Sequence, residues 1–394
     1  MSTDKYQQLG ASAKKTGVHK ALAQAGLASN HSYFASFSDD IAGDPTYRSF
    51  LHADGAGTKC IVAYLMAQET GDLKWFRGLA QDALVMNLDD IFCIGRPERL
   101  QISNTIGRNA RLITDEALSE IMSSYAELTE MLKSYDINID LMGGETADCG
   151  DTVRTLVVDA VMAGRIKAEN LISTDNVRPG DIIVGLANTG RTVYEKSDNS
   201  SIASNGLTLA RHCMLAKENA ARYPEIIDPG LSSDVAYVGP FKATDTPAEL
   251  AGMSVGEALA SPTRTFAPLL ARIYSVLGQE VHGVIHNTGG GQTKNLRFGR
   301  GNHYIKNDLF PVPPLFSLIQ KYGEVSSSEM YRVFNMGHRI ELFLEERHFA
   351  LIDTMAKELG ISAKIIGHVE KNSGSETDNQ VTISSGLGTF NYLL

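Results

Sequence analysis

The stretch Leu51-His52-Ala53-Asp54-Gly55-Ala56-Gly57-Thr58-Lys59 decides the interpretation of this chain. Directly after a short apolar run it places a carboxylate, two glycines, a hydroxyl and an ammonium. Asp54 can ligate a hard cation through oxygen, and the two glycines let backbone N–H groups approach phosphate oxygens. Thr58 and Lys59 add a donor and a positive charge. The stretch fits a loop that holds a metal-bound polyphosphate, and a plain turn between a strand and a helix remains the alternative.

The composition describes an ordinary globular chain. Its 394 residues suggest two or three domains, with 43% hydrophobic and 21% charged residues. The formal net charge of −10 argues against a nucleic-acid-binding surface, because such surfaces are basic. An anionic substrate would therefore need a site with locally placed cations or metal.

Cysteine usage and hydropathy indicate a compartment. The four cysteines include no C-x-x-C pair, so we expect reduced thiols rather than a zinc site or disulfides. No apolar run is long enough to span a bilayer, and the first residues contain no apolar signal core. We expect a cytoplasmic protein without membrane or nucleic-acid partners.

Strand and helix patterns alternate along the chain. Apolar runs predict strands at 47–53, 137–142, 155–162, 182–186, 281–285 and 380–383, and helical spacing predicts helices at 11–25, 75–93, 116–132, 206–216 and 263–277. This alternation predicts the α/β or α+β class. A turn cluster at 176–181 places a domain boundary near residue 172, which gives domains 1–172 and 173–394.

Two adjacent carboxylates, Asp89 and Asp90, fall near the end of the predicted helix 75–93. The negative end of the helix dipole disfavours them there, and a bound Mg²⁺ would offset that cost. A solvated helix face is the alternative.

A second acidic segment, Gly143-Gly144-Glu145-Thr146-Ala147-Asp148, follows the predicted strand 137–142. Its glycines allow close backbone approach, and Glu145 and Asp148 offer oxygen ligands for a metal or acceptors for a sugar. A tight turn with two exposed acids is the alternative.

Three segments of the second half place polar groups beside glycines or helix starts. His286 precedes the triplet Gly289-Gly290-Gly291, which fits a loop that wraps an anion. Ser204 and Asn205 open a helix, where either can be an N-cap or part of a phosphate site. Arg264 in a first helical turn is unfavourable for the dipole unless an anion lies beside it.

Several common catalytic motifs are absent from the sequence. It contains no G-x-x-x-x-G-K-[ST] loop, no kinase signature, no G-x-S-x-G elbow and no H-E-x-x-H helix. Nucleotide binding would therefore require a different kind of site.

Taken in order, the motifs resemble those of the aminoimidazole ribonucleotide synthetases, the phosphoribosylformylglycinamidine cyclo-ligases of the PurM-like superfamily. The matching segments are Asp54–Lys59, Asp89–Pro97, Gly143–Asp148, Ser204–Gly206, Ser261–Arg264, His286–Gly291 and Glu329–Asn335. Each is short, but seven in register across roughly residues 50–370 are specific.

The resemblance implies a fold and a reaction. It implies two α/β domains, with N-terminal sheets that pair into a barrel across a homodimer, and a cleft that binds ATP and a ribonucleotide. ATP would phosphorylate the formyl amide oxygen of formylglycinamidine ribonucleotide. The amidine nitrogen would then close the imidazole ring of aminoimidazole ribonucleotide, a step of purine biosynthesis.

The resemblance also implies roles for residues. Mg²⁺ would be held by Asp54, Asp90 and Glu145, with Asp89 and Asp148 as further ligands, and Lys59, Asp90 and His286 would be catalytic. Nucleotide or substrate would be bound by Gly55, Gly57, Thr58, Gly143, Gly144, Ser204, Asn205, Arg264, Gly289, Gly290 and Gly291.

The chain departs from the family pattern in places that concern substrate more than fold. Asp89 replaces an asparagine, Ala203 replaces a histidine, residues 191–202 look like an insertion, and 384–394 extend past the usual end. The family's N-terminal lysine has no clear counterpart. Another PurM-like enzyme, such as a small-molecule kinase, and a non-catalytic ribonucleotide-binding paralogue are the alternatives.

Overall fold

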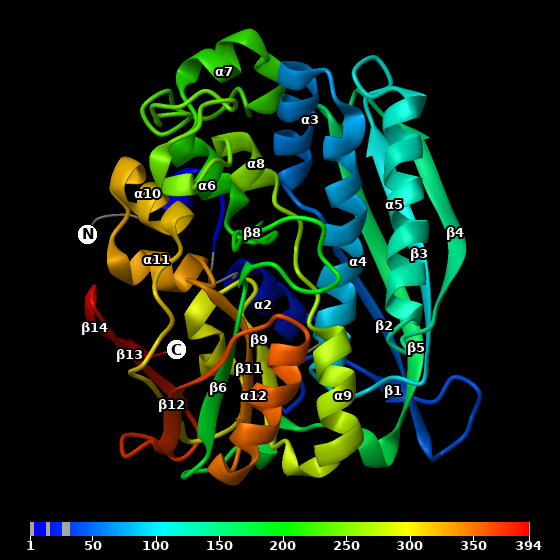
Figure 1. Ribbon diagram of the computed structural model, residues 1–394, viewed down its shortest axis with the longest axis vertical. Coiled ribbons are helices and arrows are strands. Elements are labelled where there is room, and N and C mark those ends of the chain that lie inside the picture. The colour runs from blue at the N-terminus through cyan, green and yellow to red at the C-terminus, as the bar shows by residue number, and fades with distance from the viewer. Residues whose placement is uncertain (1–3, 13–15, 26–31, 394) are drawn as a thin grey trace.

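A computed structural model describes residues 4–12, 16–25 and 32–393. The chain forms two sheets, and helices pack against each of them, which confirms the predicted α/β class (Figure 1). In those described residues, no helix combines the length and the apolarity that crossing a membrane requires.

The first sheet has five strands in the order β1-β2-β5-β3-β4. Their bounds are β1 Ser38–Asp39, β2 Tyr47–Gly55, β3 Arg99–Arg108, β4 Ile139–Asp148 and β5 Leu156–Lys167. β5 is antiparallel to β2 and β3, whereas β3 and β4 run parallel. Burial alternates along β3 and β5, so one face of this sheet is packed and the other is open.

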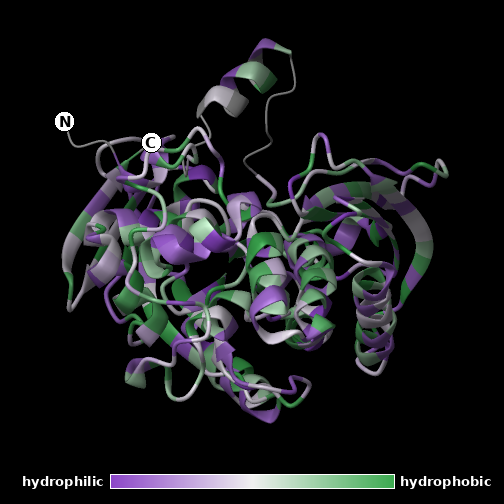
Figure 2. Ribbon diagram, turned by 90° about the horizontal axis from the view of Figure 1, so that it is seen from above, coloured by the Kyte–Doolittle hydropathy of each residue, from purple (hydrophilic) through white to green (hydrophobic). Residues whose placement is uncertain are grey.

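Three helices cover the packed face: α3 Lys59–Thr70, α4 Arg77–Phe92 and α5 Asp115–Lys133. Figure 2 views these helices nearly end-on, with the sheet as the outer wall beside them. Thr114 caps α5 by accepting from the N–H of Ala117. α4 is buried on nearly all sides because it lies between this sheet and the second domain, against α9.

The second sheet has seven strands in the order β14-β13-β10-β12-β6-β11-β9. Their bounds are β6 Ile182–Ala187, β9 Gly283–His286, β10 Asn302–Lys306, β11 His338–Leu344, β12 Ala363–Lys371, β13 Gln380–Ser385 and β14 Gly388–Leu393. β6 and β11 are buried along their whole length and form the centre of the domain. The short pair β7 Thr189–Gly190 and β8 Asn199–Ser200 lies apart from this sheet.

Helices surround this second sheet. α9 Ala267–Leu277 and α12 Phe349–Glu358 lie side by side (Figure 1). The others are α6 Leu207–Met214, α7 Lys217–Arg222, α8 Val255–Ala260, α10 Pro314–Gly323 and α11 Ser327–Val333. A 3₁₀ segment, η7 Gly291–Arg297, begins at the last glycine of the triplet.

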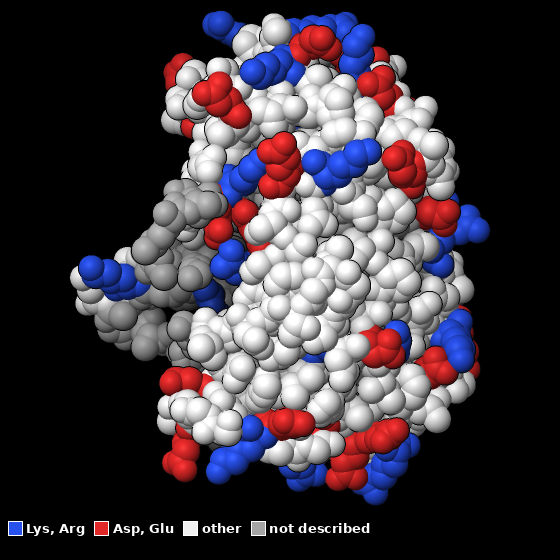
Figure 3. Space-filling view, turned by 90° about the vertical axis from the view of Figure 1, so that its left-hand side faces the viewer, with Lys and Arg blue, Asp and Glu red and all other residues white. Residues whose placement is uncertain are grey.

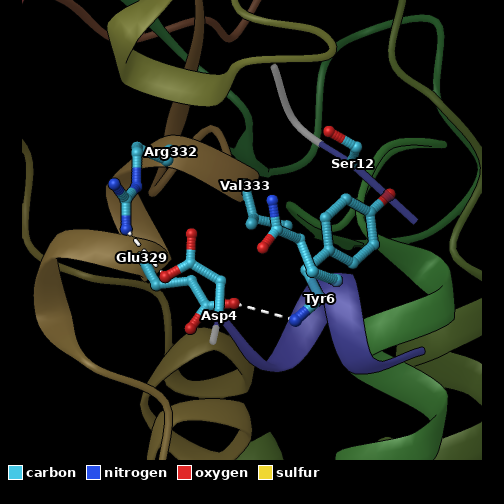
Figure 4. A pocket seen from close by; sticks show the side chains of 7 residues that line it. Asp4, Tyr6, Ser12, Glu329, Arg332 and Val333 are labelled. Atoms are coloured by element: carbon cyan, nitrogen blue, oxygen red, sulfur yellow. Dashed lines mark hydrogen bonds and ion pairs between the residues drawn. The ribbon is translucent and has the colours of Figure 1, made fainter. Parts of the chain in front are cut away.

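The N-terminal helix α1 Lys5–Gln8 docks on α11, the helix of the Glu329–Asn335 motif (Figure 4). The N–H of Tyr6 donates to Glu329 at 2.9 Å, and Arg332 pairs with Asp4 at 3.1 Å. The cavity between them measures about 10 Å³, room for one water molecule at most. This motif therefore anchors the start of the chain.

The C-terminal hairpin β13–β14 carries no charged residue from Asn379 to the chain end. A groove of about 750 Å³ separates its turn, residues 384–387, from residues 307–312. Figure 3 shows the left-hand face of Figure 1, where charged side chains gather around the edge and the middle carries few.

The structure corrects several predicted element boundaries. The segment 143–148 is no turn, because β4 continues through it, and β5 continues past residue 164. α9 begins four residues later than the predicted start at 263, and the sheet strands β3, β10, β11, β12 and β14 were not predicted. The predicted helix 11–25 corresponds to α2 Thr16–Gln24, and its residues 13–15 lie outside the described part. The domain boundary near 172 stays a prediction.

Candidate functional site between the two domains

The loop of residues 54–59 connects the end of β2 to the start of α3. Asp54 accepts from the N–H of Gly55 at 2.8 Å. A Cβ on Gly55 would lie 2.7 Å from the carbonyl oxygen of Val158, so the close pairing of β2 with β5 requires glycine. The Thr58 hydroxyl lies 3.2 Å from that of Thr208 on α6, which brings this loop against the second domain.

Lys59 points into the protein interior. Its side chain is 1% exposed, and its ammonium donates to Asp82 at 2.7 Å and to the carbonyl oxygen of Ser261 at 2.6 Å. Burial lowers the pKa of Lys59, and the carboxylate of Asp82 acts against that shift. In this arrangement the ammonium balances a buried carboxylate and joins the two domains; its predicted role towards phosphate stays untested.

One carboxylate oxygen of Asp82 accepts hydrogen bonds from several segments of the chain. The backbone N–H of Thr263 donates to Oδ1 at 2.8 Å and its hydroxyl at 2.5 Å, and the Ser204 hydroxyl does so at 3.1 Å. The predicted phosphate residue Ser204 is thereby placed at the same junction as Lys59. Sequence reasoning missed Asp82, although it lies seven residues before Asp89 and therefore on the same face of a helix.

Asp89 is fully buried and caps the helix α9 of the other domain. It accepts from the hydroxyl of Thr265 at 2.7 Å and from the N–H of Phe266 at 3.0 and 3.2 Å. Burial raises the pKa of Asp89 to about 7, against the opposing charge of Arg339. These contacts use both carboxylate oxygens, so the geometry gives this predicted metal ligand an interdomain contact.

Asp90 and His286 meet across the domain boundary. His286 Nδ1 lies 2.6 Å from Asp90 Oδ1, and both side chains are buried. Burial, together with the charge of Arg339, lowers the pKa of His286 to about 4 even though Asp90 opposes the shift. A neutral ring that donates from Nδ1 leaves Nε2 as an acceptor, and Nε2 has no hydrogen-bond partner among the described residues.

His52, on β2, binds the other oxygen of Asp90, at 3.5 Å from Nε2. Its Nδ1 lies 2.9 Å from the side-chain oxygen of Asn87, whose amide nitrogen already donates to three carbonyl oxygens. Both ring nitrogens therefore donate, which is the protonated form. Burial opposes this charge, but the bond and charge of Asp90 prevail and raise the pKa of His52 to about 9. Between His52 and His286, the pKa of Asp90 is held well below its usual range despite burial.

The strand register separates Glu145 from these acids. Thr105 pairs with both Glu145 and Asp159, and Asp159 pairs with Gly55. Glu145 is therefore three strands away from β2, roughly 14 Å at about 4.8 Å per strand. It also shares the open face with Gly55, whereas Asp54 points to the opposite face.

The other predicted residues of β4 are exposed as well, namely Gly143, Gly144 and Asp148. Asp148 pairs with Arg108 at 2.7 Å. Within one chain, the structure thus brings Asp54 and Asp90 together around His52 and leaves the acids of β4 apart from them.

The glycine triplet lies against the Glu329–Asn335 motif. A Cβ on Gly291, whose φ is 51°, would lie 2.5 Å from the carbonyl oxygen of Phe334. Behind the triplet, the buried Lys306 donates to Glu341 at 2.5 Å and to Asn295 of η7 at 2.8 Å. This buried ion pair fixes the segment that follows the glycines.

Asn205 and Arg264, two further predicted binding residues, have different surroundings. Asn205 lies beside Ser204, and its side-chain oxygen is buried without a partner among the described residues. Arg264 is 0% exposed and pairs at 2.5 Å with Glu195, which lies in the segment 191–202. Its guanidinium therefore already has an anion, supplied by the chain itself.

The donor set allows a limited test for Mg²⁺. Among the residues that the structure describes, no three His, Cys, Asp or Glu side chains gather as a metal site. Mg²⁺ is commonly held by one or two carboxylates together with substrate phosphates and water. Asp54 and Asp90 offer two carboxylates, and in this structure His52 occupies one oxygen of Asp90.

Two family models match the chain. The "AIR synthase related protein, N-terminal domain" model covers residues 39–166, and the "AIR synthase related protein, C-terminal domain" model covers residues 178–378. The resemblance predicted from the motifs is thereby confirmed.

Curated relatives carry one name. The chain is 29% identical over 332 residues to a phosphoribosylformylglycinamidine cyclo-ligase of Methanococcus vannielii, covering 83% of this chain and 79% of the relative. It is also 29% identical to the protein of that name from Methanocaldococcus jannaschii, over 82% of this chain and 78% of the relative.

Solved structures share the fold at low sequence identity. "AaThiL complexed with AMPPCP and TMP" superposes with a TM-score of 0.54 at 11% identity, covering 96% of each chain. "Crystal structure of HypE-HypF complex" gives 0.52 at 15% identity, over 96% of this chain and 98% of that one.

The buried pair of Lys59 and Asp82 generates a stability prediction. Lys59→Met leaves a buried carboxylate without its cation, so we expect the free energy of unfolding to fall by about 3–5 kcal/mol. Urea titration followed by circular dichroism measures this. Lys357→Met, which breaks an exposed pair with Asp353, is the control and should change little. If the Lys59→Met variant lost activity while its stability stayed unchanged, the result would support the predicted role of Lys59 in neutralising phosphate charge.

His52 generates a pH prediction. Because the pKa of His52 is about 9 in the folded protein and about 6.5 for a free histidine side chain, the folded state keeps one more proton between those pH values. The stabilisation by His52 is therefore complete below pH 6.5 and is lost as pH rises towards 9. We expect the stability difference between the wild type and His52→Gln to shrink by about 1–3 kcal/mol from pH 6 to pH 9.5 in urea titrations. A difference that is constant with pH would contradict the protonated ring.

Proposed function

Because the chain belongs to the AIR synthase related protein family, we propose that it closes the imidazole ring of aminoimidazole ribonucleotide. The substrates are ATP and formylglycinamidine ribonucleotide, and the products are aminoimidazole ribonucleotide, ADP and phosphate. The curated relatives that bear the cyclo-ligase name match most of the chain and support this assignment.

One observation carries the proposal at the level of geometry. Asp90 of the first domain and His286 of the second meet at 2.6 Å, beside the loop that begins at Asp54 and the triplet that begins at Gly289. Residues of four predicted motifs thus converge where the domains join. A site at such a junction can hold two substrates and exclude water from them.

The chemistry requires an activated oxygen. The formyl amide oxygen is a poor leaving group, and transfer of the γ-phosphoryl group of ATP to it creates a good one, phosphate. The amidine nitrogen then attacks the same carbon, loses a proton and expels phosphate. The protein has to position the reacting groups and neutralise charge. His286 Nε2, buried and an acceptor, is suited to bind the N–H of the attacking nitrogen.

Mg²⁺ would supply charge neutralisation at the phosphates of ATP. Asp54 and Asp90 are the residues that would hold it, and the carboxylate of Asp90 stays ionised at neutral pH. Asp89 already accepts hydrogen bonds at the N-terminus of α9. The cytoplasm remains the compartment that we propose.

We further propose that two copies pair through the open face of the first sheet. That face exposes apolar side chains on three strands: Leu51 on β2 is 71% exposed, Met142 on β4 59% and Val157 on β5 39%. Exposed apolar patches of this kind mark interaction sites. Glu145, which the single chain leaves apart from Asp54, would then face the partner subunit.

The carboxylate of Asp90 provides the test of the enzyme proposal. Asp90→Asn keeps the shape but removes the charge, so we expect ADP release dependent on formylglycinamidine ribonucleotide to fall at least a hundredfold. Asp353→Asn, at a half-buried position of α12 that pairs with Lys357, is the control. An unchanged kcat in Asp90→Asn would remove Asp90 from the site, and a wild-type protein that binds both ligands without turnover would support a non-catalytic paralogue.

The open sheet face provides the test of pairing. Leu51→Arg places a charge in the proposed interface, so we expect the particle mass to halve at micromolar concentration by light scattering after size-exclusion chromatography. Val276→Arg, at an apolar position on α9 of the second domain that is 59% exposed, should keep the wild-type mass. A wild type that is monomeric across this range contradicts the pairing.

A further inference from the structure

The β7–β8 hairpin, residues 189–200, is built around the buried side chain of Arg264. Its two strands form a separate two-stranded sheet (Figure 1). Glu195, in the loop between them, binds the guanidinium of Arg264 through both carboxylate oxygens, at 2.5 to 3.1 Å. The same guanidinium donates to backbone carbonyl oxygens within residues 187–190. All three nitrogens of this side chain are therefore bound by the hairpin and the residues that lead into it.

The hairpin also binds the rest of the junction segment, residues 261–266, which connects α8 to α9 without regular structure. Three further hydrogen bonds of 2.7 to 3.1 Å join hairpin residues to this segment: Ser200 to the hydroxyl of Ser261, and Asn199 and Tyr194 to the carbonyl oxygens of Pro262 and Thr265. With the pair of Glu195 and Arg264, four of the six residues in the junction segment are held by the hairpin.

Helix α4 of the first domain binds other polar groups of the junction segment. Asp82 accepts from the N–H and the hydroxyl of Thr263, and Asp89 accepts from the hydroxyl of Thr265 and the N–H of Phe266. Buried backbone without regular structure needs a partner for each polar group. The hairpin and α4 supply those partners together, so the junction segment is fixed only where both are in place.

The backbone that leaves the hairpin is strained. Ser201 and Ala203 adopt positive φ angles of 78° and 56°, which are unfavourable for residues other than glycine. Asn188 and Asn335 both donate to the carbonyl oxygen of Ser201, at 3.0 and 2.8 Å. Such strain persists only where the surroundings fix it, and it is common at functional sites. The hairpin is therefore held rigidly on the side that faces the predicted Ser204 segment.

Asp90 connects the junction segment to the candidate site. It directly follows Asp89 on α4, and its carboxylate lies 2.6 Å from His286 of the second domain. Successive residues of a helix move as one body because backbone hydrogen bonds hold each turn. A shift of the junction segment at Asp89 therefore moves Asp90 relative to His286.

We propose that Tyr194 and Glu195 of the hairpin are positioning residues for the reaction, because they hold the junction segment against α4 and thereby set the distance between Asp90 and His286. This rests on the proposed function. Both residues act on the site through others: Tyr194 through Thr265, and Glu195 through Arg264. Arg264 consequently serves the position of the segment.

The experiment compares the wild type with Tyr194→Phe, Glu195→Gln, Glu195→Asp and a control. Tyr194→Phe removes one hydroxyl and keeps the ring that packs edge-on against Tyr135, so this variant should fold even if Glu195→Gln does not. Lys196→Met is the matched control, because Lys196 lies on the same hairpin but is 89% exposed and pairs with Glu127. ADP release gives kcat and KM, and calorimetry gives the affinity for ATP. Hydrogen exchange of residues 259–270 gives a readout that needs no catalysis.

Tyr194→Phe and Glu195→Gln should lower kcat by about tenfold to hundredfold, the loss expected when reacting groups are misplaced by on the order of 1 Å. KM and the affinity for ATP should change much less than kcat. Glu195→Asp keeps the charge and should recover most of kcat. Exchange of residues 259–270 should become about fivefold faster in Tyr194→Phe, the size expected for the loss of one buried hydrogen bond. Exchange of the hairpin β13–β14 should stay as in the wild type.

The same measurements separate this proposal from the cyclo-ligase assignment. If the wild type shows no turnover but exchange in Tyr194→Phe rises only in residues 259–270, the cyclo-ligase assignment fails and the hold of the hairpin on the junction segment stands. If Tyr194→Phe and Glu195→Gln match Lys196→Met in kcat and in exchange, the positioning role is overturned. It is also overturned if exchange rises equally in β13–β14, since the loss of activity then reflects general destabilisation.

Discussion

The face of α4 that meets the second domain is the constraint on which the rest of the structure depends. It presents three buried carboxylates, and each accepts from the other domain: Asp82 from Thr263, Asp89 from Phe266 and Asp90 from His286. Asp89 and Asp90 follow Asp82 by seven and eight residues, which is about two turns of a helix. Because buried carboxylates are costly unless their partners are in place, this face permits essentially one arrangement of the two domains.

That constraint divides the acidic residues of the motifs into two kinds. Oδ1 of Asp82 and both oxygens of Asp89 are bound by groups of the protein, and these contacts join the two domains. Asp90 is held between two imidazole rings, and we propose it as the carboxylate whose partners a ligand exchanges. The difference lies in the donors: Lys59 and the backbone N–H of Phe266 are fixed by the fold, whereas a histidine on a strand edge can rotate about its side-chain bonds.

Hydrophobic periodicity predicted six of the strands and five of the helices among the described residues, because burial imposes it directly; β3, β10, β11, β12 and β14 and the helices α3, α10, α11 and α12 were not predicted. The failures concern what periodicity does not encode. The segment from Gly143 to Asp148 contains two glycines and two acids, yet it forms a strand, because pairing with β3 outweighs local turn preference. Nothing local in the sequence says that Lys59 meets Asp82, 23 residues later, or that His52 meets Asp90, since those contacts follow from the packing of α4 on β2.

The motifs therefore predicted which segments meet more reliably than which atoms act. Glycine positions carried that prediction, since Gly55 and Gly291 each allow an approach that a Cβ would block. Charged residues did not, because a cation can serve a ligand or balance a buried acid, and the sequence spacing is the same in both cases. The fold resolves this only by showing which carboxylate each cation faces. Lys59, Arg264 and Lys306 all lie inside the protein against its own carboxylates, so the position of a cation in the sequence does not by itself identify a phosphate ligand.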